Sequence, residues 1–595
     1  MDIPPTLTAK RASAGRPTLT FITVAVTAAL LLWAHALVHD GGNHGLTPIF
    51  SYLFAVEDAA ALKGALWIAL AAALISKRLQ ARALLRWIGG NPGWVAVAAL
   101  GLLSCGAWIV YRHAPLSMDE YSAVFQSRVF AAGHLAGQFP QRQIDWLIPR
   151  GFQNYFLNVT PDGLVTSGYW PSFALLLTPF TWLGIPWMCN PALSALTVLA
   201  VHRLAMQIFA EREAAGMAVL LTVASPVFFA NGISYYSMSA HLLANTLYAS
   251  LLAAPTFRKA CAAGLIGSVA LTLHNPVPHM LFALPWIVAL LHRSDGSRLV
   301  LALFAGYLPL CLLLGLGWFV LTSPTAAALI GGTAAGGTAA GSIAVGSIAV
   351  GSIGTTGIAH LNAPFAWPTS GVMLARAIGI AKIWAWSVPG LMVVAAVGAW
   401  KWRHDTACRL LTLSALLTVV GYAFVPFDQG HGWGYRYFHS AWMALPLLAA
   451  AAVTALPGRL ATRHAAGTDR GPSAPPGAAR TFEDGATQAC IAACALFSLF
   501  AGTGLRAVQI HRFVVRHESQ WPAYAGTEPR VVILDTRGTF YGRDLVQNDP
   551  WLRGDTIVMI THGPQADGDM MRANYPHLQR VYADRYGSVW SAVRP

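Results

Sequence analysis

The sequence predicts an all-α polytopic membrane protein with about thirteen transmembrane helices, external loops and a small C-terminal α/β domain. Of its 595 residues, 55% are hydrophobic and only 11% are charged, and the mean hydropathy is +0.51. Soluble domains carry about 25% charged residues, so this composition excludes an ordinary soluble protein. The 21 tryptophans fit the aromatic belts found at membrane interfaces.

Apolar runs of roughly 20 residues, the length that crosses a bilayer, define the expected spans. Their approximate ranges are 19–38, 58–76, 93–111, 190–209, 215–231, 238–254, 260–274, 277–292, 298–322, 388–402, 407–425, 438–456 and 488–508. The segment 169–187 is apolar too, but Pro171, Pro179 and Pro186 interrupt it. A span there would place later basic loops on the wrong side. We therefore expect a re-entrant or surface helix.

Most lysines and arginines lie in short loops between the apolar runs. The net charge of +14 therefore reflects membrane orientation and gives no reason to expect nucleic acid as a partner. With 169–187 kept out of the membrane, the basic loops fall on one side, which the positive-inside rule assigns to the cytoplasm. This predicts a cytoplasmic N-terminus and an external C-terminal domain; the family resemblance described below implies that the membrane is a bacterial inner membrane and the external side the periplasm.

Composition divides the chain into five parts. They are a basic segment with an extra helix pair (1–92), a membrane core (93–456) with external loops at 112–189, 323–387 and 426–437, a disordered cytoplasmic linker (457–487), a last helix (488–508) and an α/β domain (509–595). Pentad repeats rich in Gly and Ala occupy 331–355, which predicts a flexible loop, with a lid over the active site as the alternative.

The C-terminal part alternates short β-runs with one helical segment. Residues 531–534 and 556–560 are the expected strands, and 567–574 is the expected helix before a further apolar run at 579–582. The seven cysteines lie in or beside apolar stretches, so we expect neither a disulfide framework nor a cysteine metal site.

An acidic pair, Asp119 and Glu120, follows the apolar run 93–111 and precedes an amphipathic stretch at 121–135. Carboxylates at a membrane surface are costly to hold there, and they indicate a functional site by default. The alternative is an acidic helix start, because Ser117 and Asp119 both suit an N-cap.

Further motifs accompany this pair in a fixed order. They are a loop segment ending in aromatic residues and proline (160–171), a helix end and the following start (224–229 and 234–241), a hairpin (264–276) and a Gly-rich Arg-Tyr loop (432–437). Together, residues 93–456 resemble bacterial GT-C glycosyltransferases of the lipid-linked-sugar type, which include aminoarabinose transferases and protein O-mannosyltransferases. Where relatives usually have a basic residue before the hairpin proline, this chain has Asn275 preceded by His274.

The resemblance implies a GT-C fold and transfer of a hexosyl or pentosyl group from a polyprenyl-phosphate donor to a periplasmic glycan, lipid or protein of the cell envelope. Such a transfer needs a base for the acceptor proton, groups that stabilise the departing phosphate, and a water-shielded pocket. By position in the family motif, Asp119 is the expected base and Glu120 is the second catalytic candidate.

Arg436 is the expected phosphate ligand, because a guanidinium fork suits phosphate oxygens and the flanking glycines allow close approach. The alternative is an interfacial arginine that faces lipid headgroups. Further phosphate candidates are His274, His279 and Lys382. Substrate-binding candidates are Tyr169, Trp170, His241, His431, Trp433 and Tyr437. For the histidines the alternative is a satisfied polar group, and for the aromatics an interfacial girdle.

No cofactor is certain from the sequence, and dependence on a divalent metal stays open. His274, His279 and the acidic pair would supply nitrogen and oxygen ligands, but no HExxH spacing occurs. Membrane lipids are expected partners. The alternative functions are a lipid-linked glycan flippase or transporter, an O-antigen-type ligase, and a nonenzymatic membrane scaffold. A transporter would need intramembrane charges and often an inverted repeat, and neither is evident in the sequence.

Overall fold

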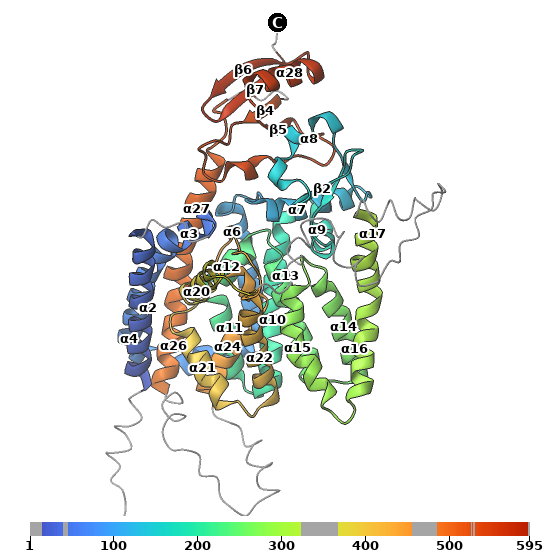
Figure 1. Ribbon diagram of the computed structural model, residues 1–595. Coiled ribbons are helices and arrows are strands. Elements are labelled where there is room, and N and C mark those ends of the chain that lie inside the picture. The colour runs from blue at the N-terminus through green and yellow to red at the C-terminus, as the bar shows by residue number, and fades with distance from the viewer. Residues whose placement is uncertain are drawn as a thin grey trace, which may run out of the picture.

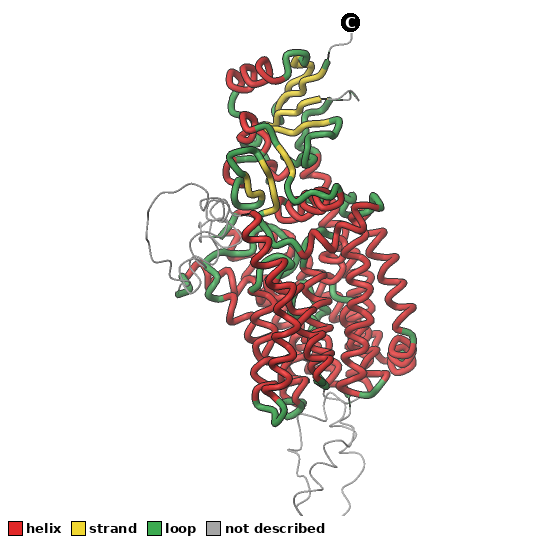
Figure 2. The backbone as a smooth tube through the Cα atoms, turned by 90° about the vertical axis from the view of Figure 1, so that its right-hand side faces the viewer, coloured by secondary structure: helices red, strands yellow, loops and turns green. Residues whose placement is uncertain are grey.

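The structure is a computed structural model that describes residues 15–39, 46–322, 367–454, 485–524, 526 and 530–592. Helices form one long bundle, and the strands are confined to the end that carries the C-terminus (Figure 2). Helices α7 and α9 lie between the bundle and the C-terminal sheet (Figure 1). The expected fold class, a helical membrane protein with a small C-terminal α/β domain, is confirmed.

The bundle consists of apolar helices that vary widely in length. They are α2 (Gly15–His39), α3 (Pro48–Tyr52), α4 (Ala59–Ile75), α5 (Ala81–Gly90), α6 (Pro92–Ile109), α10 (Cys189–Phe209), α11 (Arg212–Val223), α12 (Pro226–Ile233), α13 (Met238–Leu252), α14 (Phe257–Leu271), α15 (Val277–Leu291), α16 (Gly296–Leu310), α17 (Trp318–Thr322), α20 (Ser370–Ala385), α21 (Leu391–Lys401), α22 (Thr406–Tyr422), α23 (Arg436–His439), α24 (Ala444–Val453), α26 (Gly485–Phe497) and α27 (Thr503–Glu518). Short π-helical segments, η1 (Leu53–Asp58), η6 (Cys311–Gly317) and η8 (Ser498–Gly502), join several of them.

Six helical stretches within the described ranges are long and apolar enough to cross a membrane. They are Arg16–Leu37, Pro48–Arg78, Pro92–Ile109, Pro186–Phe209, Gly296–Thr322 and Gly485–Glu518. The pair α11 and α12, bent by 59°, would make a seventh. Four shorter apolar helices, Val277–Leu291, Leu391–Lys401, Thr406–Tyr422 and Ala444–Val453, cover other predicted spans. The chain is therefore multi-pass, while the number thirteen stays a prediction.

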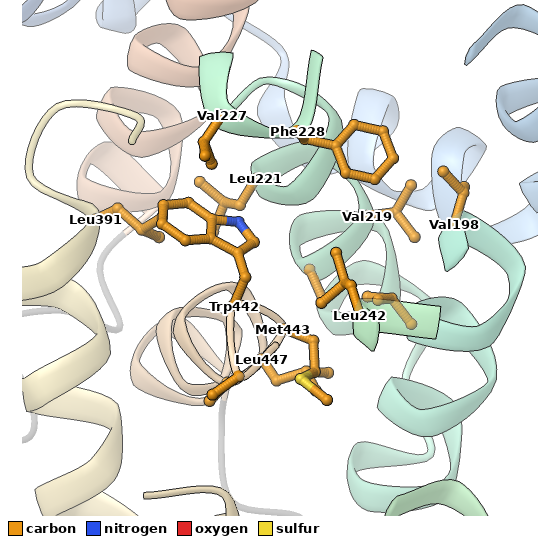
Figure 3. Packing of buried hydrophobic residues seen from close by; sticks show 14 of the residues in the cluster. Val198, Val219, Leu221, Val227, Phe228, Leu242, Leu391, Trp442, Met443 and Leu447 are labelled. Atoms are coloured by element: carbon orange, nitrogen blue, oxygen red, sulfur yellow. The ribbon is translucent and has the colours of Figure 1, made fainter. Parts of the chain in front are cut away.

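The core of the bundle is built from small and branched apolar side chains around a few large ones. Trp442 lies with Leu391 and Leu447 near Leu221 and Val227 (Figure 3). Small residues let the helix backbones approach closely. A Cβ atom on Gly398 of α21 would lie 1.7 Å from the Leu448 carbonyl oxygen of α24. Side-chain size therefore sets the spacing of these two helices.

Outside the bundle, the long loop after α6 folds into α7 (Met118–Ala131), α8 (Ile144–Leu147), α9 (Ser172–Trp182) and a small antiparallel sheet. Its strands β1 (Gly137–Gln138), β2 (Leu157–Val159) and β3 (Leu164–Ser167) have the order β1-β3-β2. The short helix α9 agrees with the expectation that 169–187 does not form a full span. Residues 331–355 and most of the predicted linker lie outside the described residues.

The C-terminal domain contains β4 (Arg530–Leu534), η9 (Gly542–Leu545), β5 (Thr556–Ile560), α28 (Pro564–Asn574), β6 (Gln579–Asp584) and β7 (Gly587–Ser591). Its sheet has the order β5-β4-β7-β6, with β4 parallel to β5 and antiparallel to β7. The expected strands and helix are therefore present. Two boundaries differ: α27 continues to Glu518 rather than ending near 508, and α20 forms inside the predicted loop 323–387.

A second hydrophobic core joins the C-terminal domain to the loop after α6. Tyr121, Phe125 and Val129 from one face of α7 pack with Val531 and Met559 from the C-terminal sheet. The start of α7, which carries the acidic pair, is therefore held between the bundle and this domain.

Candidate active site

Helix α7 begins with a complete capping box. Ser117 is the N-cap residue, and its backbone N–H donates to the carboxylate of Glu120 over 3.1 Å. That carboxylate also accepts from the Leu116 N–H, the Tyr111 hydroxyl and the Tyr235 N–H over 3.1, 2.9 and 2.8 Å. Burial raises the pKa of Glu120 to about 7, although these donors act in the opposite direction. We expected Glu120 to be a second catalytic residue, but its position does not support that role. The side chain is buried, and its hydrogen bonds hold the first turn of α7 in place.

Asp119, one residue earlier, points to a different environment. Its carboxylate accepts a hydrogen bond from the Tyr169 hydroxyl and forms an ion pair of 3.2 Å with Arg436. Burial alone would raise the pKa of Asp119, but Arg436, His274 and the Tyr169 hydroxyl together hold it below the usual value. Asp119 is therefore an ionised carboxylate at neutral pH.

The loop before α23 places Arg436 opposite this carboxylate. The guanidinium donates to the Gln429 carbonyl oxygen over 2.5 Å and lies over the Tyr236 ring at 4.5 Å. Its Nε is buried and has no hydrogen-bond partner in the described part of the chain. Gly432 has φ +125°, and a Cβ there would lie 2.5 Å from Cδ and Nε of Arg436. Glycine at 432 thus makes room for the arginine side chain.

A narrow pocket opens beside Asp119. Its volume is about 10 Å³, which is room for roughly one water molecule. It is lined by Asp119, Ala123, Ser167, Tyr169, Trp170, Phe173, Ala174, Tyr236, Ser237, Met238, Leu273 and His274. The rings of Tyr169 and His274 lie 4.0 Å apart. The structure therefore brings Asp119, Tyr169, Trp170 and His274 to one pocket, with Arg436 in contact with its carboxylate.

Two predicted phosphate ligands lie elsewhere. The ring nitrogens of His279 bond to Asn245 and Tyr307, each over 2.7 Å, inside the bundle. Lys382 is buried and forms an ion pair of 2.7 Å with Asp58, which Arg506 also contacts at 2.8 Å. These predictions are corrected, because both side chains are fully engaged away from the pocket. The same cluster shows that buried intramembrane charges exist, contrary to the expectation from sequence.

Four predicted substrate ligands lie behind the pocket or away from it. His431 Nδ1 bonds to the Tyr236 hydroxyl over 2.7 Å, and Trp433 Nε1 donates to the Tyr111 hydroxyl over 3.3 Å. The Tyr437 hydroxyl donates to the Asp428 carbonyl oxygen over 3.0 Å, and its ring stacks on Tyr422. His241 is fully buried in α13. None of the four lines the pocket, so direct contact with substrate is not supported by their positions.

Tyr236 was not predicted as a site residue. Its ring lies below Arg436, its hydroxyl lies 2.9 Å from Ser117 Oγ, and it lines the pocket. Tyr236 lies in the break between α12 and α13, next to Tyr235. Two adjacent tyrosines at a helix break were the sequence feature that could have indicated this site residue.

Asp544, in η9 of the C-terminal domain, was missed as well. It accepts a hydrogen bond of 2.7 Å from the Met118 N–H at the head of α7. Burial raises the pKa of Asp544 to about 8, against the opposing effect of this hydrogen bond, and the nearby charges of Asp119 and Glu120 raise it further. No local motif identifies this contact, since its partners are 426 positions apart.

Within the described ranges, no group of three or more His, Cys, Asp or Glu side chains could hold a metal ion. The structure therefore does not decide whether the protein depends on a divalent metal.

No protein-family model and no curated protein matches the chain. Among solved structures it is similar to ArnT from Cupriavidus metallidurans bound to undecaprenyl phosphate, at 13% identity over 84% of this chain and 98% of that chain, with a TM-score of 0.46. The apo form of the same protein gives the same identity and coverage with a TM-score of 0.40.

Proposed function

We propose that the chain is an integral-membrane GT-C glycosyltransferase that transfers a sugar from a polyprenyl-phosphate donor to a hydroxyl group, with Asp119 as the general base. The observation that carries this proposal is the contact of Asp119 with Arg436 and Tyr169 at a pocket on the C-terminal-domain end of the bundle. A proton acceptor and a phosphate-binding cation then lie within one small site.

Each group has a separate task in the transfer. The ionised Asp119 takes the proton of the acceptor hydroxyl as the oxygen attacks the anomeric carbon of the donor sugar. Arg436 and the partly buried His274 stabilise the charge that develops on the departing phosphate. Tyr169, Trp170 and Tyr236 line the pocket, and their rings would contact the sugar once the pocket, with a volume of about 10 Å³, widens to admit the donor.

The ion pair between Arg436 and Asp119 also makes the basicity of Asp119 depend on donor binding. Arg436 lowers the pKa of Asp119 in the free protein. A phosphate that binds Arg436 neutralises this guanidinium, so the carboxylate becomes a stronger base when the donor is in place. Glu120 acts through position: its buried hydrogen bonds fix the first turn of α7 and thereby the direction of Asp119.

Orientation in the membrane follows from charge. Basic loops lie at the end of the bundle opposite the C-terminal domain, so we assign that end to the cytoplasm and the pocket to the periplasmic face.

The test uses purified protein, a panel of polyprenyl-phosphate monosaccharides and mass spectrometry of released sugar. Asp119→Asn should lower transfer at least 100-fold, since general base catalysis contributes about 10²–10⁴-fold. Asp162→Asn is the matched control, because Asp162 is an exposed carboxylate in the same external region. Transfer by Asp119→Asn at the wild-type rate would refute the assignment.

A further inference from the structure

A large groove runs between α15 and α22, from the helix ends that lie opposite the C-terminal sheet in Figure 1 along most of the length of α22. The groove has a volume of about 910 Å³, and the end of α13 closes one side of it. It shares no lining residue with the Asp119 pocket.

The walls of this groove are aliphatic and open to the outside of the bundle. Leu284 and Val288 of α15 face Leu413, Leu416 and Val420 of α22, and all five side chains are exposed. The groove extends along α22 from residue 406 to residue 420, a length of about 21 Å at 1.5 Å per residue. One leaflet contributes about 15 Å of hydrocarbon. The groove is therefore long enough to bind an acyl chain along its full path through one leaflet.

Basic side chains line the open lower end of the groove. Arg293, Arg409 and His292 all contribute to its lining. Arg293 pairs with Asp295 at 2.9 Å, but both side chains are 48% exposed, and such a pair is weak. Arg409 forms no ion pair in the part of the chain that the structure describes. The nearby carboxylate of Asp405 caps α22 through the Cys408 N–H. The mouth therefore presents guanidinium groups at headgroup depth.

We propose that this groove binds an anionic phospholipid, with an acyl chain along the leucine wall and the headgroup phosphate on Arg409 and Arg293. Guanidinium groups suit phosphate oxygens, and basic pockets between transmembrane helices on the cytoplasmic side bind anionic headgroups. The inference is independent of the proposed transfer reaction, because the groove and the Asp119 pocket share no lining residue.

Native mass spectrometry of the detergent-purified full chain tests the proposal. Phosphatidylglycerol should remain bound at concentrations where phosphatidylcholine with the same acyl chains does not. Each arginine near the surface strengthens anionic lipid binding about fivefold, so Arg293→Gln with Arg409→Gln should weaken phosphatidylglycerol binding about 25-fold. Leu416→Trp, which fills the groove, should also reduce binding and leaves the arginines unchanged.

The matched control is Arg298→Gln with Arg403→Gln, because Arg298 in the first turn of α16 and Arg403 in the turn after α21 do not line the groove. This control should bind phosphatidylglycerol as the wild type does. Equal binding of the two lipids, an equal loss in the control, or displacement of the lipid by polyprenyl phosphate would overturn the proposal. If the arginine pair impairs folding, the result with Leu416→Trp decides.

Discussion

Asp544→Asn is the change that most directly tests how the C-terminal domain holds the start of α7, which carries Asp119. Asp544 is buried, accepts the Met118 N–H at the head of α7, and has a pKa raised by burial to about 8. Asparagine keeps an acceptor oxygen in the same place but has no proton to lose. The variant therefore keeps the helix cap and removes the titration.

The expected effect on stability follows from proton linkage. An aspartate in the unfolded chain loses its proton near pH 4, while Asp544 in the folded protein keeps it until about pH 8. Across this window the folded state binds more protons, so the free energy of unfolding falls by about 1.4 kcal/mol per pH unit as pH rises. Glu120, with a pKa of about 7, adds a second contribution of the same sign up to that pH.

The assay is guanidinium unfolding of the detergent-solubilised protein at pH 5, 6, 7 and 8. The wild type should lose stability more steeply with pH than Asp544→Asn, and the difference in slope should be about 1.4 kcal/mol per unit. Asp555→Asn removes an exposed carboxylate from the same domain and is the control. Parallel slopes for wild type and Asp544→Asn would show that Asp544 titrates normally, and the account of this buried cluster would be wrong.

Three other changes have defined outcomes. Asp58→Asn should lower the free energy of unfolding by about 3–5 kcal/mol, because two buried cations lose a counter-ion; an unchanged unfolding midpoint would contradict this. Gly432→Ala should raise the KM for the donor and also lower stability, since its Cβ would meet Arg436 at 2.5 Å and φ there is +125°; a wild-type KM would argue against the phosphate role. Tyr169→Phe removes a donor that lowers the pKa of Asp119, so the acid limb of the pH–rate profile should move to higher pH, and an unmoved limb would exclude the effect.

The apolar runs and short strands of this chain were predictable because they depend on local pattern. The predicted strand 531–534 corresponds to β4, and the prolines in 169–187 correctly indicated the short helix α9. The pairing of Asp119 with Arg436, 317 positions apart, does not follow from local pattern. The motif resemblance had named both residues, Asp119 as the base and Arg436 as the phosphate ligand, but it did not predict the ion pair between them.

The remaining site residues were not predictable, because burial and partners decide what a polar side chain does. Lys382 looked like a free external cation, but its ammonium group pairs with Asp58, 324 positions away. His279 stood near a turn and looked available, yet both ring nitrogens are engaged inside the bundle. Neighbours in sequence also diverge: Asp119 faces the pocket, while Glu120 turns inward to the helix start.

The contact between Asp544 and the Met118 N–H has a consequence for biosynthesis. The head of α7 emerges from the ribosome 426 residues before its acceptor, which at about 5–20 residues per second is a delay of roughly 20 to 85 s. During that interval the head of α7 lacks one of its hydrogen-bond acceptors. The arrangement around Asp119 is therefore complete only after the segment that carries Asp544 has folded onto α7.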